Sequence, residues 1–242
     1  VEQTLNGFDA GLNALPPLLV IAVLALVAWR FSGKGLAIFT LITMIFVGLL
    51  GLWEDTMTTL AMVLSSVIFC ALAGITLGIW SGRSDSVETG MRPVLDAMQT
   101  TPAFVYLVPI VMLFSVGNVA GVLATIVFAL PPIIRLTSLG IRQVHPELVE
   151  AAQAFGANRW QVLTRVQIPL AMPTILAGLN QTIMMALSMV VIAALIGAGG
   201  LGSPVILGLN TLDIGRAVIG GLGIVLMAIV LDRITQSMAQ KK

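Results

Sequence analysis

The chain has 242 residues, of which 58% are hydrophobic and only 10% are charged, and its mean hydropathy is +1.05. So few charges cannot cover a soluble particle of this size, because polar atoms must face water over much of its surface. A formal net charge of +1, without a basic run, gives no indication of nucleic-acid binding. The composition therefore predicts an all-α polytopic membrane protein. Residues 1–14 are expected to be an external segment without a signal peptide. The natural N-terminus is expected to be longer or processed.

Seven apolar stretches follow, each near the roughly 20 residues that a helix needs to cross about 30 Å of hydrocarbon. One uncharged run between Asp96 and Arg135 is too long for a single span, and Gly117-Asn118 is expected to divide it. In chain order, we expect spans over about 15–29, 35–53, 57–80, 100–116, 119–134, 174–196 and 214–231. They would form one transmembrane domain over 15–242, with a short polar connection at 81–93 and a larger cytoplasmic loop at about 140–173.

The basic residues orient these spans. If the N-terminus lies outside, eleven of the twelve Lys and Arg residues fall on the inside and only Arg216 lies outside, as the positive-inside rule requires. Trp29, Trp53 and Trp80 then fall at span ends, where indole rings favour the headgroup level. We therefore expect the N-terminus outside and the C-terminus in the cytoplasm.

Residue types that carry enzymatic chemistry are scarce. The single cysteine excludes an intrachain disulfide and a cysteine metal cluster, and the single histidine leaves zinc binding and histidine-based catalysis poorly supplied. The middles of the predicted spans lack ionisable residues, which argues against a proton-coupled pump and against an intramembrane hydrolase. The glycine pattern over 197–202 resembles a dinucleotide motif but follows a membrane helix instead of a strand, so we interpret it as a closely packed turn.

Polar residues inside the spans are candidates for a solute pathway. Any one of them could instead bond to a neighbouring helix carbonyl. Asn180 and Gln181 stand out, because two amides deep in an apolar helix need partners or water. Nearby methionines can adjust their shape around a moving ligand. The predicted pathway set is Ser65, Thr101, Tyr106, Asn180, Gln181, Met184 and Ser188.

The inside segment 145–173 reads HPELVEAAQAFGANRWQVLTRVQIPLAMP. Pro146 is suited to the first turn of a helix, and Gly156 is suited to end it. Asn158 can cap a second helix, which the prolines at the end of the segment are expected to terminate. The pattern predicts a helix–turn–helix on the cytoplasmic face, and taken alone it could be a simple connector.

This segment resembles the cytoplasmic EAA loop of type I ABC-importer permeases, in which EAA is followed after three residues by Gly and after nine more by I-x-L-P. The matching positions are Glu150, Ala151, Ala152, Gly156 and Pro169, with conservative departures at Val166 and Ile168. The resemblance extends to the order of the spans and to the IGAGGLG turn. It is strongest to the bacterial glycine betaine/proline betaine (ProU-type) osmoprotectant permeases.

The resemblance implies a transport subunit of the bacterial inner membrane with no catalytic site, metal or cofactor of its own. ATP and Mg²⁺ would bind to two copies of a cytoplasmic ABC ATPase, a periplasmic binding protein would deliver the solute, and a second identical permease chain would complete the path. The implied ATPase-coupling residues are Glu147, Glu150, Ala151, Ala152, Gly156, Arg159, Trp160 and Pro169. The implied gate or receptor-side turn comprises Gly197, Gly199, Gly200 and Gly202. Choline or an amino acid as the solute, and a secondary transporter as the class, are the alternatives.

Overall fold

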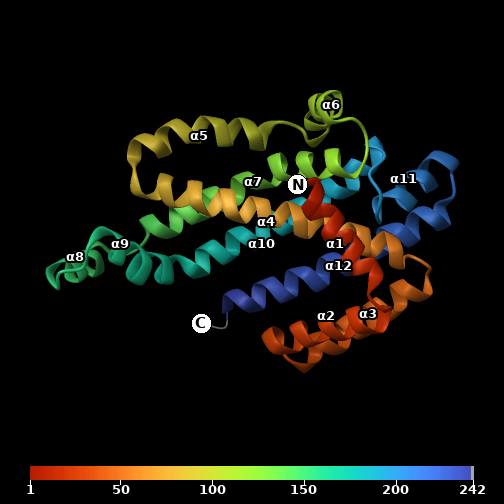
Figure 1. Cartoon of the computed structure of the whole chain (residues 1–242), viewed down its shortest axis with the longest axis horizontal. Helices are drawn as coiled ribbons and strands as arrows, with labels where there is room; N and C mark the ends of the chain where they lie inside the picture. Colours follow the sequence, from red (N-terminus) through yellow and green to blue (C-terminus); the bar gives the residue numbers. More distant parts are fainter. Residues whose placement is uncertain (241–242) are drawn as a thin grey trace.

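The computed structural model describes residues 1–240, which form helices joined by short connections (Figure 1). No strand occurs in this described range, so the all-α prediction is confirmed. The first half comprises α1 (Glu2–Ala14), α2 (Pro17–Ser32), α3 (Lys34–Leu49), α4 (Trp53–Arg83), α5 (Asp85–Thr100) and α6 (Ala103–Phe114). The second half comprises α7 (Asn118–Arg142), α8 (Pro146–Ala154), α9 (Arg159–Val162), the π-helical η1 (Leu163–Gln167), α10 (Ile168–Ala193), the 3₁₀ turn η2 (Ala194–Ile196), α11 (Gly202–Thr211) and α12 (Ile214–Gln240).

Each of the seven predicted spans corresponds to an apolar helix, but the helices differ in length. Four helical stretches are long and apolar enough to cross a bilayer: α4, α7, the continuous helix from α9 to α10, and α12. The helix α3 is apolar but shorter, with 16 residues. The remaining two expected spans belong to bent pairs, in which α1 and α2 meet at 109° and α5 and α6 meet at 97°.

The predicted boundaries around α5 are wrong in two places. The stretch 81–93 is not a loop, because α4 continues to Arg83 and α5 begins at Asp85. The expected span over 100–116 contains only the twelve residues of α6, about 18 Å of helix. Pro102 explains the break, since the residue before a proline is driven out of the helical conformation, and Thr101 is extended.

The expectation that Pro169 and Pro173 end the helix begun at Arg159 is also wrong. That helix continues through η1 into α10, with Pro169 in its first turn and Pro173 inside it. Proline cannot donate a backbone hydrogen bond. The π-helical segment allows the helix to continue past Pro169. In this segment the Ile168 N–H donates to the Leu163 carbonyl, five residues earlier.

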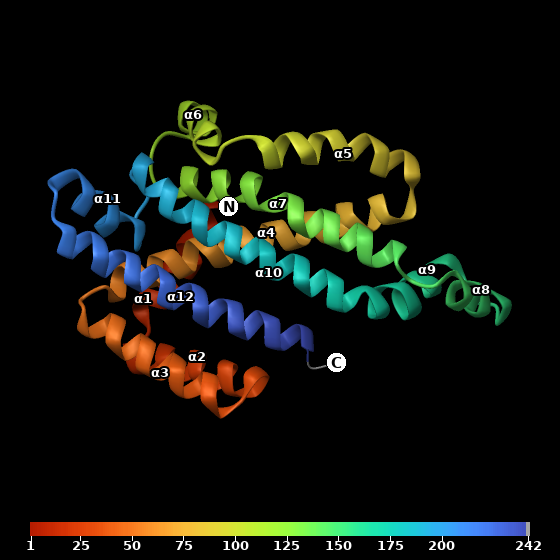
Figure 2. The same ribbon diagram turned by 180° about the vertical axis from the view of Figure 1, so that it is seen from behind.

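The core lies where α7 packs between α4 and α10, which both views show side by side (Figures 1 and 2). Gly74 and Gly78 lie on the face of α4 that contacts α7. A Cβ added to Gly74 would overlap the side chain of Ile133, and one added to Gly78 would overlap that of Thr137. Glycines four residues apart share one helix face and allow this close approach. The G-x-x-x-G spacing of Gly74 and Gly78 is therefore a helix-packing feature.

The two ends of the helix bundle carry different elements. We call the end with α8 and α9 the loop end, and the end with residues 197–202 and α11 the turn end (Figures 1 and 2). The helices α4 and α7 both run toward the loop end, and α10 runs back toward the turn end (Figures 1 and 2). The C-terminal ends of α4 and α7 and the start of α10 gather at the loop end, whereas the glycine turn joins α10 to α11 at the other.

Candidate functional site

The first helix of the EAA-like segment ends as its sequence predicts. Gly156 has a φ of +85°, its N–H donates to the Gln153 carbonyl (2.9 Å), and the Ala157 N–H donates to the Ala152 carbonyl (3.0 Å). This pair of bonds is the Schellman pattern of helix ends. No atom lies within 4 Å of the position that a Gly156 Cβ would take. Glycine is therefore suited to this site by its backbone conformation, not by a lack of space.

The second helix of the segment has a reciprocal cap, and the prediction that Asn158 starts it is confirmed. The Asn158 side chain accepts hydrogen bonds from the backbone N–H groups of Trp160 (3.1 Å) and Gln161 (2.9 Å). The Gln161 side chain accepts one in return from the Asn158 N–H (2.9 Å). The turn between α8 and α9 is thus defined by its own residues.

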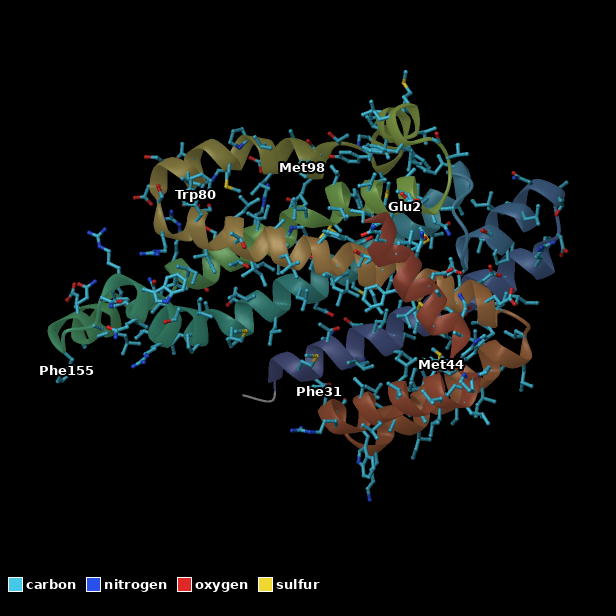
Figure 3. The ribbon with its side chains drawn as sticks, viewed as in Figure 1. Glu2, Phe31, Met44, Trp80, Met98 and Phe155 are labelled. Atoms are coloured by element: carbon cyan, nitrogen blue, oxygen red, sulfur yellow. The ribbon has the colours of Figure 1, made fainter. Side chains whose placement is uncertain are left out.

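Side chains of this segment project freely from the loop end. None of the α8 residues is buried, and Phe155, just after the helix, is 94% exposed (Figure 3). Trp160 is 68% exposed and lines an open cleft of about 340 Å³ together with Trp80 and Leu163. Sequence reasoning selected Trp160 and missed Phe155, whose position directly before the helix-ending glycine was the available signal. Of the other predicted coupling residues, those exposed are Glu147, Glu150, Ala151, Arg159 and Pro169, while Ala152 is partly buried.

One face of α10 remains open along most of its length. Gln181 and Ser188 are exposed and lie seven residues apart, so they occupy the same side of the helix as the exposed Pro173 and Ala177. The Ser188 hydroxyl donates to the carbonyl of the partly buried Met184 (3.0 Å). The structure therefore brings three of the predicted pathway residues together on one helix.

Asn180 points elsewhere. Its Nδ2 donates to Asp232 Oδ1 on α12 (3.0 Å), and Gln236 Nε2 donates to both oxygens of the same carboxylate (2.8 Å each). Asn180 thus joins α10 to α12, and Gln181 is the amide left on the open face. Sequence reasoning missed Asp232 because the apolar stretch ends at Leu231, whereas the helix continues.

The other predicted pathway residues lie apart from this face. Ser65 is fully buried in α4, and its hydroxyl has no hydrogen-bond partner among the residues described. Thr101 lies at the break between α5 and α6. Tyr106 bridges that break, because its hydroxyl donates to the Met98 carbonyl (2.6 Å), and its ring contacts Phe128 edge to face. The predicted set is therefore divided among the open face of α10, the α10–α12 contact, the core helix α4 and the bent pair α5–α6.

The glycine turn fastens three helices together at the turn end. The Gly199 N–H donates to Asn118 Oδ1 at the start of α7 (2.6 Å), and the Leu201 N–H donates to Thr59 Oγ1 near the start of α4 (2.8 Å). A Cβ on Gly200 would lie 3.2 Å from the Thr59 backbone nitrogen. Positive φ angles occur at Gly197 and Gly200, and Gly202 opens α11. The pattern is a closely packed turn, as interpreted from its sequence.

Residues 74–242 match the family described as "Binding-protein-dependent transport system inner membrane component". The chain belongs to this family. It is 56% identical over 240 residues to the glycine betaine/proline betaine transport system permease protein ProW of Escherichia coli (strain K12), and the match covers 99% of this chain and 68% of ProW. It is 49% identical over 237 residues to the glycine betaine transport system permease protein OpuAB of Bacillus subtilis (strain 168), covering 98% and 84% of the two chains.

Solved structures show the same fold. A chain of the MetNI methionine ABC transporter, in an inward-facing conformation, superposes with a TM-score of 0.68 at 21% identity, covering 81% of this chain and 96% of that one. At this identity the likeness describes the fold alone. The family and the fold together identify a multi-pass permease subunit of an ABC importer, which is a transport component and not an enzyme.

Proposed function

We propose that this chain forms the translocation path of an ATP-driven importer for glycine betaine, proline betaine and related small osmoprotectants. The observation that carries the proposal is the 56% identity, over 99% of the chain, to a permease of a glycine betaine/proline betaine system. Choline or an amino acid is the alternative solute for the same subunit. A secondary transporter would instead need coupling-ion ligands within the spans.

The proposed partners are those that the family resemblance implies, and the arrangement of the two ends is compatible with them. Two copies of a cytoplasmic ATPase, which carry the ATP and Mg²⁺, would dock on the exposed α8 and α9 of two identical permease chains. A periplasmic binding protein would meet the turn end. This orientation is supported by the basic residues, because Arg83, Arg142, Arg159 and Arg165 all lie in elements at the loop end. It puts the external segment 1–14 outside and the C-terminus in the cytoplasm of a bacterial cell.

The transport cycle uses the docking segment, which we define as residues 146–162 with the π-helical turn that follows. Closure of the ATPases around ATP would draw the two docking segments together and open the path outward, and hydrolysis would reset it. Gln181 and Ser188 offer a few polar contacts along an otherwise apolar face, which suits a solute that must leave again. The chain's single tyrosine is partly buried and bonded to a carbonyl. We expect an aromatic cage for a quaternary ammonium group on the binding protein instead.

Reconstitution tests this proposal. The chain would be purified with its ATPase, placed in liposomes with candidate binding proteins, and supplied with radiolabelled glycine betaine, proline betaine, choline or an amino acid. We expect the ATPase to co-purify and the betaines to accumulate only with ATP and a binding protein. Accumulation of choline or an amino acid alone would contradict the substrate, and accumulation without the ATPase would contradict the class of transporter.

A further inference from the structure

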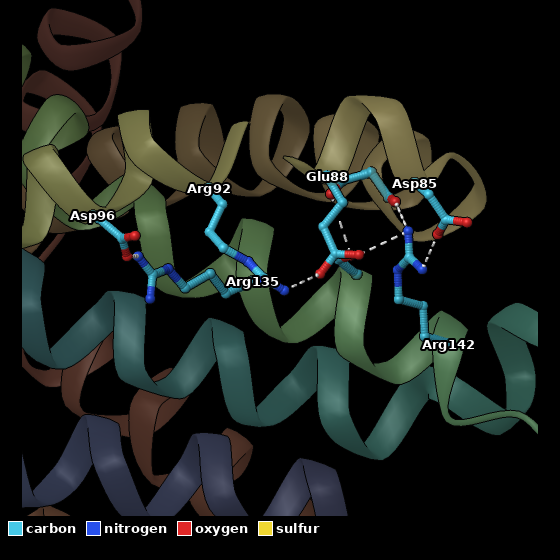
Figure 4. Close-up of polar contacts among 8 residues, drawn as sticks. Asp85, Glu88, Arg92, Asp96, Arg135 and Arg142 are labelled. Atoms are coloured by element: carbon cyan, nitrogen blue, oxygen red, sulfur yellow. Dashed lines mark hydrogen bonds and ion pairs between the residues drawn. The ribbon is translucent and has the colours of Figure 1, made fainter. Parts of the chain in front are cut away.

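Arg142, the last residue of α7, joins three helices at the loop end (Figure 4). Its guanidinium forms an ion pair with Asp85 (2.6 Å) and another with Glu88 (2.9 Å), both in the first turn of α5. It also donates to the Ser81 carbonyl near the end of α4 (2.8 Å). Glu88 in turn accepts a bond from Arg92 on its own helix (3.1 Å).

Apolar packing attaches α5 only weakly to the bundle. Leu95 is its single buried residue within the described range. A cavity of about 260 Å³ lies between α5 and the neighbouring α4 and α7, with Met91, Leu95 and Leu139 in its lining. A lone exposed ion pair would contribute little to holding such a helix. Arg142 differs because its side chain is only 28% exposed and makes three contacts at once, which needs the planar fork of a guanidinium.

The position of Arg142 connects two parts of the site. Only residues 143–145 separate it from the first helix of the docking segment. At its other end, α5 leads to Thr101 and Tyr106, where the Tyr106 hydroxyl fixes the bend by binding the Met98 carbonyl. A displacement of the end of α7 would therefore reach α5 through charged contacts, and through α5 it would reach Thr101 and Tyr106, two of the predicted pathway residues.

We propose that Arg142 is a positioning residue that transmits movement of the docking segment to α5 and the α5–α6 bend. The proposal rests on the proposed function as an ATP-driven importer. Arg142 touches neither solute nor nucleotide in this scheme. It determines whether the bend follows the docking segment, so its loss separates ATP hydrolysis from import.

The chain offers a matched control in Arg135. This residue lies seven positions earlier on the same face of α7 and pairs with Asp96, also on α5 (Figure 4). It has the same charge and the same partner helix, but it lies two helical turns further from the docking segment. Arg135 makes one ion pair with α5 whereas Arg142 makes two, so Arg135→Gln tests whether the loss of any charged contact between α7 and α5 is enough to change coupling.

The test compares wild type, Arg142→Gln, Arg142→Lys and Arg135→Gln as full complexes with ATPase and binding protein in liposomes. The quantity measured is solute imported per ATP hydrolysed. For Arg142→Gln we expect normal retention of the ATPase and about a tenfold lower ratio, within the range typical of coupling between sites. Arg142→Lys should fall between, since an ammonium cannot reach all three partners. Arg135→Gln should stay near the wild-type ratio.

An unchanged ratio in Arg142→Gln, or an equal fall in Arg135→Gln, would overturn the proposal. If Arg142→Gln does not assemble, the double variant Asp85→Asn/Glu88→Gln removes the same contacts from α5 and is judged by the same outcomes. The proposed function fails separately. If the wild-type complex imports no betaine, the proposed function is contradicted. If the wild type imports betaine and Arg142→Gln has the same ratio, only the role of Arg142 is contradicted.

Discussion

At the scale of single residues, the two neighbouring amides of α10 have different surroundings. Gln181 is exposed on the open face, whereas Asn180 is bonded to Asp232. Gln181→Leu should therefore reduce transport while leaving insertion and ATPase assembly intact. Asn180→Leu should instead reduce stability, because it removes a hydrogen-bond donor from the partly buried Asp232 carboxylate, and such a loss costs up to about 1–3 kcal/mol. Transport normalised to purified complex, together with the melting temperature of each variant, measures both effects. Normal transport by Gln181→Leu would mean that the path lies elsewhere.

Phe155 is expected to be a main anchor for the ATPase. A side chain that is 94% exposed on a defined turn can bury most of its surface in a partner, and aromatic residues dominate such contacts. Phe155→Ala should therefore lower the amount of ATPase that co-purifies. The decrease should be larger than for Trp160→Ala, because Trp160 already lines a cleft beside α4. Equal retention by Phe155→Ala and wild type would show that the turn does not contact the ATPase.

At the scale of helices, the predictions based on capping residues were correct, whereas some boundaries based on hydropathy or on single prolines were not. The ends of the helices in the docking segment were predicted correctly because the backbone preferences of Pro146 and Gly156 and the capping bonds of Asn158 act within a few positions. The break at Pro102 was missed because hydropathy alone does not divide an uncharged run correctly. The continuity of α9 and α10 was missed because a π-helical turn compensates for Pro169. The Asn180–Asp232 contact depends on the packing of two distant helices, which no local pattern reveals.

The α4–α7 contact supplies a prediction at this scale. Gly78→Ala adds a Cβ that would lie 2.5 Å from the Thr137 Cβ, whereas Gly221→Ala, on α12, adds one with no atom within 4 Å. Overpacking a close helix contact destabilises by about 1–3 kcal/mol. Gly221→Ala should be neutral or slightly stabilising in comparison. Unfolding of both variants in detergent checks this, and equal stabilities would show that the helices separate easily.

At the scale of the whole molecule, the two ends should face opposite sides of the membrane. Thr56, at the start of α4, is buried, so the exposed Leu212 at the turn end and the exposed Ser86 at the loop end are suitable reporters of orientation. In a chain with Cys70→Ala, cysteines at these two positions should react with an impermeant thiol reagent from outside and inside, respectively. Labelling of both from one side would contradict the orientation.

Control of import by the docking segment is tested most directly by one paired measurement in liposomes that hold the complete complex. ATP hydrolysis and accumulation of labelled glycine betaine are recorded together for wild type and Gly156→Val. A β-branched residue at a φ of +85° is strained by about 1–2 kcal/mol, which disturbs the turn that presents α8. We expect wild type to accumulate betaine at the expense of ATP, and Gly156→Val to insert normally yet lose stimulated hydrolysis and uptake together. Normal hydrolysis and uptake by Gly156→Val would show that the segment is only a connector.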